Sequence, residues 1–204
     1  MVDYFIQGGA FMWPILALLA VGLAFSIERF WTLTRASVNT RKFLAKLHNA
    51  LQEGGIEGAA AECEKTPGPV ASILHAGLSR AEKGLEFVEK AISNAGSIEM
   101  AFLERGMVVL TTVIVLAPML GFTGTVAGMV DAFEAIKVKN DISPNIVAGG
   151  ISKALLTTLF GLIVAMIIQV LYNYFSSRID KLVIDMEESS VELMDALVEM
   201  QDKK

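Results

Sequence analysis

The chain has 204 residues, of which 53% are hydrophobic and 19% are charged, and its formal net charge is −5. This composition is too apolar for an average soluble domain, and the acidic balance argues against a nucleic-acid-binding protein. With Cys63 as its one cysteine and only two histidines, the sequence offers neither a disulfide framework nor a zinc cluster. No cofactor and no metal are therefore expected.

Charged residues are segregated along the chain. No Asp, Glu, Lys or Arg occurs in residues 4–27, 106–130 or 154–177, and the remaining segments have the charge density of solvated helices. A bilayer core about 30 Å thick is crossed by about 20 apolar residues of helix. The first window is not a signal peptide, because no basic residue precedes it and no clear cleavage site follows. The predicted membrane-spanning helices are residues 11–33, 107–133 and 152–175.

Basic residues near the ends of these spans predict the orientation. Residues 1–10 contain none, whereas residues 28–105 contain ten. Loops on the cytoplasmic side of a membrane carry an excess of Lys and Arg, so the N-terminus is predicted to be periplasmic. The remaining predicted segments are a cytoplasmic helical domain at 34–106, a periplasmic loop at 134–151 and a cytoplasmic C-terminal helix at 176–204.

The segments outside the membrane show helical spacing of apolar residues. Helices are predicted at 38–53, ending at Gly54-Gly55, then at 56–65 and at 70–83. Beyond Gly84 the helical spacing continues into the second span, and the third span is expected to continue as one helix from Ser152 to Met200. The predicted fold is therefore an all-α membrane protein with long cytoplasmic helical extensions.

Small residues form one stripe down each of the second and third spans. Such residues let helix backbones approach closely in a membrane, where van der Waals packing then holds them. Close packing of the two helices, within one subunit and between subunits, is the simplest interpretation. The residues expected to make this contact are Gly121, Gly124, Gly128, Gly161 and Ala165.

Threonine hydroxyls lie inside the same two spans. A threonine in a membrane helix most often bonds the carbonyl one turn back, but Thr125 and Thr158 lie on the small-residue stripes and would offer a polar strip to water or ions. A hydroxyl neither takes up nor releases a proton near neutral pH, and the charge-free windows contain no Asp, Glu, Lys, Arg or His. Either a partner brings a carboxylate into the membrane, or the chain does not move protons. The candidate ion-pathway residues are Thr123, Thr125, Thr157 and Thr158.

Two longer motifs resemble the signatures of the MotA/TolQ/ExbB family. They are APMLGFTGTVAGM at 117–129, followed by Ala132-Phe133, and AGGISKALLTTLFGL at 148–162, followed by Tyr172-Asn173. The resemblance covers the whole chain. It implies a pentameric ring in the bacterial inner membrane, with pore-lining threonines at the positions of Thr125 and Thr158. It also implies a single-span partner of the ExbD/TolR type with a membrane aspartate, and gradient-driven work in the envelope.

Two positions depart from the family pattern. Lys153 stands where many members carry glutamate, and Ile167 stands where many carry proline. Lys153 would repel cations, pair with Asp131 or Glu134, or be an ordinary interface lysine. Asp131, Glu134 and Lys153 are the candidate pore-mouth charges.

Two other functions are weighed against an ion-driven motor subunit. A non-conducting membrane scaffold would need only the packing stripes, and a membrane enzyme would need a nucleophile and base that the sequence does not offer. No catalytic residue is therefore assigned. Neither the coupled ion, H⁺ or Na⁺, nor the envelope process follows from the residues. The first loop has fewer basic and acidic signalling features than a flagellar role would require, which favours the TolQ/ExbB side.

Overall fold

The computed structural model describes residues 2–37, 40–139 and 144–202, and every regular element in these ranges is helical. Three helical stretches are long and apolar enough to cross a membrane, within Met12–Lys65, Leu85–Val138 and Val147–Met200. The predicted all-α architecture with three long apolar helices is confirmed. The elements are α1 (Val2–Gln7), α2 (Met12–Ala36), α3 (Thr40–Lys65), α4 (Pro69–Leu78), the 3₁₀ helix η1 (Ala81–Lys83), α5 (Leu85–Leu103), α6 (Met107–Lys139) and α7 (Pro144–Asp202).

The chain divides into two compact units. Unit 1 comprises Met1–Arg29 and Gly106–Tyr174, and unit 2 comprises Phe30–Arg105 and Phe175–Lys204. Helices α2 and α7 each contribute residues to both units. Helix α7 is continuous from Pro144 to Asp202, which confirms the single helix predicted from Ser152 to Met200.

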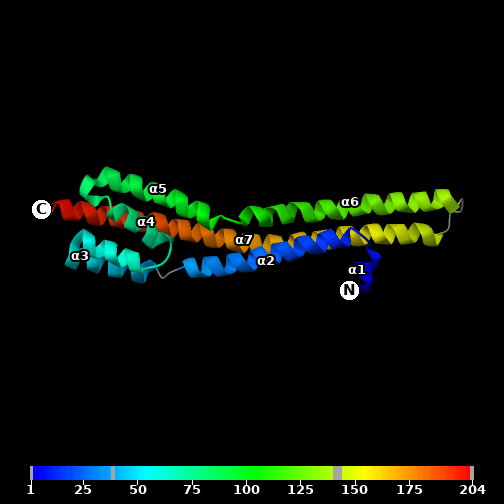
Figure 1. The fold of residues 1–204 in the computed structure, drawn as a ribbon, viewed down its shortest axis with the longest axis horizontal. Helices are drawn as coiled ribbons and strands as arrows, with labels where there is room; N and C mark the ends of the chain where they lie inside the picture. Colours follow the sequence, from blue (N-terminus) through cyan, green and yellow to red (C-terminus); the bar gives the residue numbers. More distant parts are fainter. Residues whose placement is uncertain (1, 38–39, 140–143, 203–204) are drawn as a thin grey trace. The chain divides into compact units, whose positions relative to one another are not determined.

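Unit 1 is a bundle of apolar helices in which α6 and α7 lie side by side (Figure 1). Helix α2 packs against both of them at Gly22, where an added Cβ would lie 2.7 Å from Ile168 Cδ1 and 3.4 Å from Val113 Cγ1. Ile168 and Val113 are fully buried. The absence of a side chain at Gly22 thus allows three helices to meet in one packed core.

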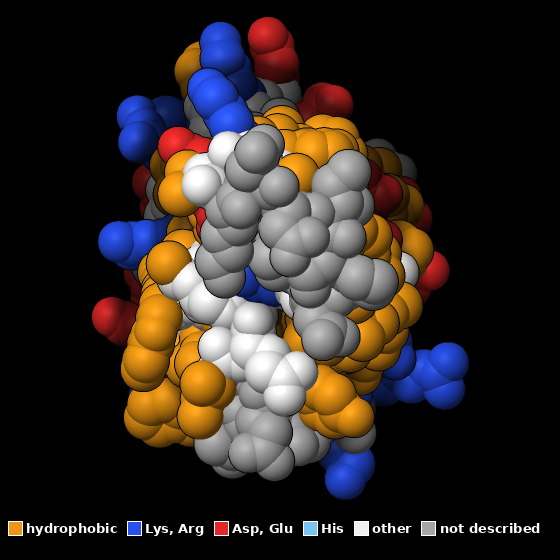
Figure 2. All heavy atoms as spheres, turned by 90° about the vertical axis from the view of Figure 1, so that its right-hand side faces the viewer, with side chains coloured by type: hydrophobic (Ala, Val, Ile, Leu, Met, Phe, Trp, Pro, Cys, Tyr) orange, Lys and Arg blue, Asp and Glu red, His pale blue; other side chains and the backbone are white. Residues whose placement is uncertain are grey.

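The outside of unit 1 is as apolar as its core. Large hydrophobic side chains such as Val108, Phe122 and Val170 are at least 66% exposed. Figure 2 views the end of this unit that carries the connection between α6 and α7, and hydrophobic side chains cover its flanks. Water would penalise so much exposed apolar area, whereas the hydrocarbon core of a bilayer would not.

Unit 2 is a helical domain built around α4. This helix contacts both α3 and α5, and its Ile73 and Leu74 side chains are almost completely buried. At Gly77 an added Cβ would lie 2.7 Å from Ile92 Cγ1 of α5, so the two helices approach closely there. The remainder of the core comes from apolar positions at helical spacing, including Phe43, Leu47, Leu51, Val88, Leu182, Met186, Leu193 and Leu197.

The predicted helix at 70–83 is wrong at its C-terminal end. Helix α4 stops at Leu78, where the Arg80 N–H donates to Gly77 O at 2.9 Å, and the separate 3₁₀ turn η1 follows. Gly84 then adopts φ 107°, a conformation that favours glycine, and α5 begins at the next residue. Residues 79–83 lack the apolar side chains that would hold another helical turn against the core.

Two other helix boundaries involve glycines with positive φ. Gly55 has φ 63° and ψ −155°, so α3 bends where the sequence predicts a break between two helices. The predicted start of the first of these helices, Val38, lies outside the described residues. The predicted continuous helix from Leu85 into the second span is wrong, because α5 ends at Leu103 and Gly106 has φ 85° before α6 begins. Glycine adopts a positive φ at little steric cost, so each of these residues can interrupt the regular helix.

Cys63 of α3 is buried, and its thiol is expected to be unreactive in the folded chain. Burial, with a smaller contribution from Glu62, raises the pKa of Cys63 from its ordinary value of 9.0 to about 12. Since the thiolate is the nucleophile, iodoacetamide at pH 8 should alkylate the folded protein on the order of 1000-fold more slowly than the guanidinium-unfolded chain. Mass spectrometry of timed samples measures both rates, and equal rates would contradict the buried thiol.

The same shift in pKa gives a pH dependence with a defined sign. Above about pH 9 the unfolded chain loses the Cys63 proton while the folded chain retains it up to about pH 12. The free energy of unfolding should therefore fall as the pH rises through this window. Denaturant unfolding at pH 8 and pH 10 measures the fall, and Cys63→Ala should remove the part that comes from this residue.

Candidate functional site

The contact between α6 and α7 is made by backbone meeting backbone. An added Cβ at Gly161 would lie 2.5 Å from the carbonyl oxygen of Ala117, and one at Gly121 would lie 2.9 Å from the carbonyl oxygen of Thr157. Real Cβ atoms essentially never come closer than 3.0 Å to a heavy atom of another part of the chain. Only glycine at these two positions therefore permits the observed separation of the helices.

The same contact continues along both helices. Gly124 faces the side chain of Thr157, and Gly128 faces Ala154, where an added Cβ would lie 3.1 Å from the Ala154 Cβ. Gly150 packs against Ala132 in the next turn. Ala165, the last of the predicted packing residues, is buried with 8% exposure. The predicted glycines thus lie between two helices of a single chain.

Three of the four candidate threonines gather around the carbonyl oxygen of Gly121. The Oγ1 atoms of Thr158, Thr125 and Thr157 lie 3.1, 3.2 and 3.3 Å from this oxygen. The hydroxyls of Thr125 and Thr158 also share a hydrogen bond across the two helices. Thr157 donates to the carbonyl of Ala154 at 2.7 Å. Thr125, Thr157 and Thr158 are called the threonine cluster below.

The members of the threonine cluster differ in exposure. Thr157 is 1% exposed and closed off, whereas Thr125 and Thr158 are half-buried. Each hydroxyl has one proton to donate and two lone pairs that accept. Each therefore donates to only one of the oxygens that lie within hydrogen-bonding distance of it. The hydroxyl oxygens of Thr125 and Thr158 therefore keep acceptor capacity at the surface of the helix pair.

Thr123 lies outside the threonine cluster. Its side chain is exposed, and its hydroxyl donates to the carbonyl of Met119, one turn back in the same helix, at 2.8 Å. This is the ordinary arrangement of a threonine in an apolar helix. Thr123 is therefore placed apart from the other three candidate ion-pathway threonines.

A cross-helix ion pair lies beyond the threonine cluster. Lys153 Nζ donates to Asp131 Oδ2 at 3.0 Å, with side-chain exposures of 37% and 62%. The pairing with Asp131 is one of the alternatives that the sequence leaves open, whereas Glu134 is exposed and forms no ion pair with Lys153 among the described residues. Asp131 follows Thr125 by six residues, or about 9 Å of helix.

The turn before α2 rests on the stem of Lys153. Gly9 has φ 75°, and an added Cβ there would lie 2.5 Å from Lys153 Cε. Residues from α6, α7 and this turn thus meet at one ammonium group. A partly exposed ion pair contributes only about 0–1 kcal/mol to stability, so its main effect here is to neutralise the lysine.

Two backbone carbonyls are part of the site, and no residue pattern predicts them. Gly121 O and Ala154 O accept bonds from the threonine cluster, but residue identities do not encode which carbonyl faces a hydroxyl across a helix pair. Gly150 could have been found, because it extends the spacing of Ala154, Thr158 and Gly161 by one turn. No group of metal-ligating side chains occurs in the described ranges. The threonine cluster and the two carbonyls thus offer uncharged oxygens, and Asp131, paired with Lys153, offers a carboxylate beyond them.

Comparisons with known proteins agree with the motifs. The model of the MotA/TolQ/ExbB proton channel family matches residues 65–188. The chain is 34% identical over 180 residues to a protein of Methanothermobacter thermautotrophicus named as an ExbB homolog, covering 88% of this chain and 64% of that protein. It is 38% identical over 91 residues to the biopolymer transport protein ExbB of Xanthomonas campestris, covering 45% and 36% of the two chains.

A third relative is the Tol-Pal system protein TolQ of Pseudomonas aeruginosa. It is 34% identical over 99 residues, which cover 48% of this chain and 43% of that protein. The aligned residues thus span less than two thirds of each of these three relatives.

Proposed function

Since the chain belongs to the MotA/TolQ/ExbB proton channel family, we propose that it is the pore-forming subunit of an ion-driven motor in the cytoplasmic (inner) membrane. Several copies, five by resemblance to the family, form a ring whose α6 and α7 helices face a central pore. The N-terminus is periplasmic and unit 2 is cytoplasmic. The motor couples an H⁺ or Na⁺ gradient to mechanical work in the cell envelope.

The threonine cluster is the observation that carries this proposal. Half-buried hydroxyl oxygens at Thr125 and Thr158, backed by the carbonyls of Gly121 and Ala154, supply ligands that can replace part of the hydration of a cation. The large side chains exposed near them on α6 and α7, such as Phe122, Val126 and Leu155, are apolar. A structure that served packing alone would not need hydroxyls at half-buried positions.

The threonine cluster can contact a passing ion, but its hydroxyls cannot take up and release a proton near neutral pH. Each elementary charge that crosses the membrane gains about 2.3 kcal/mol per 100 mV, and a motor must bind and release that charge at a titrating or ligating group. The charge-free windows of this chain contain no carboxylate. A single-span partner of the ExbD/TolR type therefore supplies the membrane aspartate, and the threonine cluster borders its path.

A non-conducting scaffold is the alternative function. The glycine contact between α6 and α7 supports it, because that contact needs no ion to be useful. Transport by the assembled complex discriminates the two functions.

Reconstitution into liposomes tests the proposal. The purified chain alone is expected to give no gradient-coupled H⁺ or Na⁺ flux, whereas the chain co-purified with the single-span protein encoded beside it should give a flux that a pH-sensitive or Na⁺-sensitive dye records. Replacing the membrane aspartate of that partner with asparagine should abolish the flux while the complex stays intact. Sustained flux without the partner, or none with it, would contradict the division of roles.

A further inference from the structure

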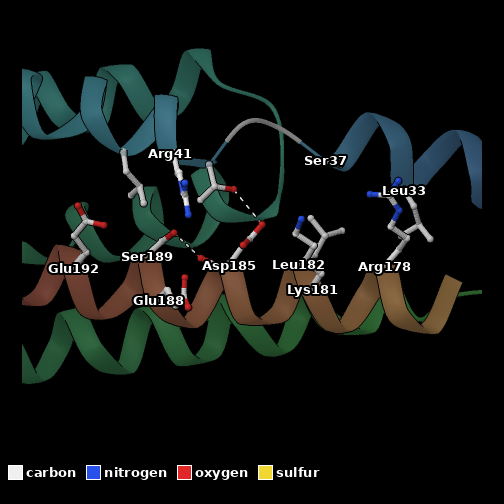
Figure 3. Close-up of a pocket in the computed structure, with 12 residues that line it drawn as sticks. Leu33, Ser37, Arg41, Arg178, Lys181, Leu182, Asp185, Glu188, Ser189 and Glu192 are labelled. Atoms are coloured by element: carbon white, nitrogen blue, oxygen red, sulfur yellow. Dashed lines mark hydrogen bonds between the residues drawn. The ribbon is translucent and has the colours of Figure 1, made fainter. Parts of the chain in front are cut away.

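A charged cavity lies in unit 2, close to where the apolar parts of α2 and α7 end. Its volume is about 560 Å³, and its wall is formed by the end of α2, the start of α3 and one face of α7 (Figure 3). Leu33, Leu44 and Leu182 supply apolar wall, while hydroxyls and charged groups supply the rest. The charged residues that line it are Arg41, Arg178, Lys181, Asp185, Glu188 and Glu192.

The charges are ordered along α7. Arg178 and Lys181 come first, and Asp185, Glu188 and Glu192 follow at intervals of four, three and four residues, so all five share one helix face. Arg178 follows directly on the charge-free window 154–177. The basic end of the cavity is therefore nearest the apolar part of α7, and the acidic end is farther along the helix.

Most of these charged groups have no ion-pair partner among the described residues. Among the residues that the structure describes, neither Arg41 nor Lys181 forms an ion pair, and none of the three carboxylates does. The order of basic before acidic is also the less favourable orientation for pairs four residues apart on a helix. Cationic and carboxylate side chains without an ion-pair partner thus line the same cavity.

Asp185 is held in place by the neighbouring helix. Thr40 Oγ1, at the start of α3, donates to Asp185 Oδ2 at 3.3 Å (Figure 3), and the Ser189 hydroxyl donates to the Asp185 backbone carbonyl at 2.5 Å. The side chain of Arg41 extends from α3 toward the same stretch of α7. The acidic and basic groups are therefore brought together by two helices rather than by sequence proximity alone.

We propose that this cavity binds the phosphoethanolamine headgroup of a membrane lipid. The phosphate would face Arg178, Lys181 and Arg41, and the primary ammonium would face Asp185 and Glu188. In such a lipid the phosphate lies nearer the acyl chains than the ammonium, which matches the order of charge on α7. The two-carbon linker between them spans a distance similar to the one helical turn, about 5.4 Å, that separates Lys181 from Asp185.

The two neighbouring headgroup chemistries fit less well. Phosphatidylglycerol has no ammonium for the carboxylates, and phosphatidylcholine carries a quaternary ammonium with no N–H to donate. The inference rests on the membrane placement of α2 and α7 in the proposed function, but not on ion flow.

Native mass spectrometry of the chain in neutral detergent tests the site. With lipids of identical acyl chains added singly, phosphatidylethanolamine should be retained about tenfold more than phosphatidylglycerol or phosphatidylcholine. Lys181→Gln should lower its retention about tenfold. Asp185→Asn, which keeps the acceptor for Thr40, should remove the preference for phosphatidylethanolamine over phosphatidylglycerol. Lys90→Gln, an exposed lysine of α5 outside the cavity, is the matched control and should change nothing.

Free phosphoethanolamine, added as a competitor, distinguishes the lipid from its soluble headgroup. It should displace the lipid only at far higher concentration, because it lacks the acyl chains. Binding of the free compound without retention of the lipid would overturn the proposal, and so would equal retention of all three lipids or wild-type retention by both variants. The measurement needs neither partner nor gradient, so its failure is distinguishable from a failure of the proposed motor function.

Discussion

Replacing Thr158 with valine is expected to reduce ion flux through the assembled complex about tenfold or more, while the protein stays folded and assembled. Valine keeps the shape of the side chain but removes the hydroxyl that donates to Gly121 O at 3.1 Å and bonds the hydroxyl of Thr125. One lost hydrogen-bonding ligand is worth about 1–1.5 kcal/mol, which corresponds to about tenfold. Thr125→Val, which removes the other half-buried hydroxyl of the threonine cluster, should also lower the flux, but to a lesser degree.

Two control variants separate the hydroxyl from the helix. Thr158→Ser keeps the oxygen and should retain most of the flux. Thr123→Val makes the same chemical change on α6, but at an exposed hydroxyl that bonds only the preceding turn, and should behave like the wild type. Dye-monitored flux in liposomes that contain the chain and its partner is the measurement, with native mass spectrometry to confirm assembly. Unchanged flux in both Thr125→Val and Thr158→Val would rule out the threonine cluster as the ion path.

Much of the helical architecture could be predicted because its causes are local. Segregated charge and helical spacing act within one stretch of chain, so the apolar helices α2, α6 and α7 follow from them. The break after Leu78 and the break at Gly106 did not follow, because apolar residues at helical spacing precede each break and resume beyond it. A single glycine with positive φ changes the direction of the chain without changing that pattern.

The candidate site was partly predictable for a related reason. Stripes of small residues predict that two helices meet, and the glycines do lie between α6 and α7. The stripes do not fix the relative height of the helices, which determines whether Lys153 pairs with Asp131 or Glu134. They also do not separate Thr123 from Thr125, which lie two residues apart and face different sides of α6.

Substituting leucine for Gly121 is expected to have the largest effect on the structure itself. An added Cβ alone would lie 2.9 Å from Thr157 O and 3.0 Å from Thr158 Cα, and these are backbone atoms that cannot rotate away. Helices α6 and α7 must therefore separate, which also breaks the hydrogen bonds around the Gly121 carbonyl. Overpacking of about 3 kcal/mol corresponds to a fall in Tm of about 6–12 °C for a chain of this size.

The substitution is expected to disrupt the fold of each subunit, and loss of the proposed oligomer should follow from that disruption. Gly149→Leu is the matched control on α7, because no described atom lies within 4 Å of a Cβ added there. Thermal unfolding in detergent should show the fall in Tm for Gly121→Leu only, and native mass spectrometry should show loss of its oligomer only. Gly161→Ala tests the same contact from the other helix, since its Cβ would meet the carbonyl oxygen of Ala117 at 2.5 Å. If Gly121→Leu and Gly161→Ala both keep the wild-type Tm and oligomer, α6 and α7 do not pack backbone to backbone in the membrane.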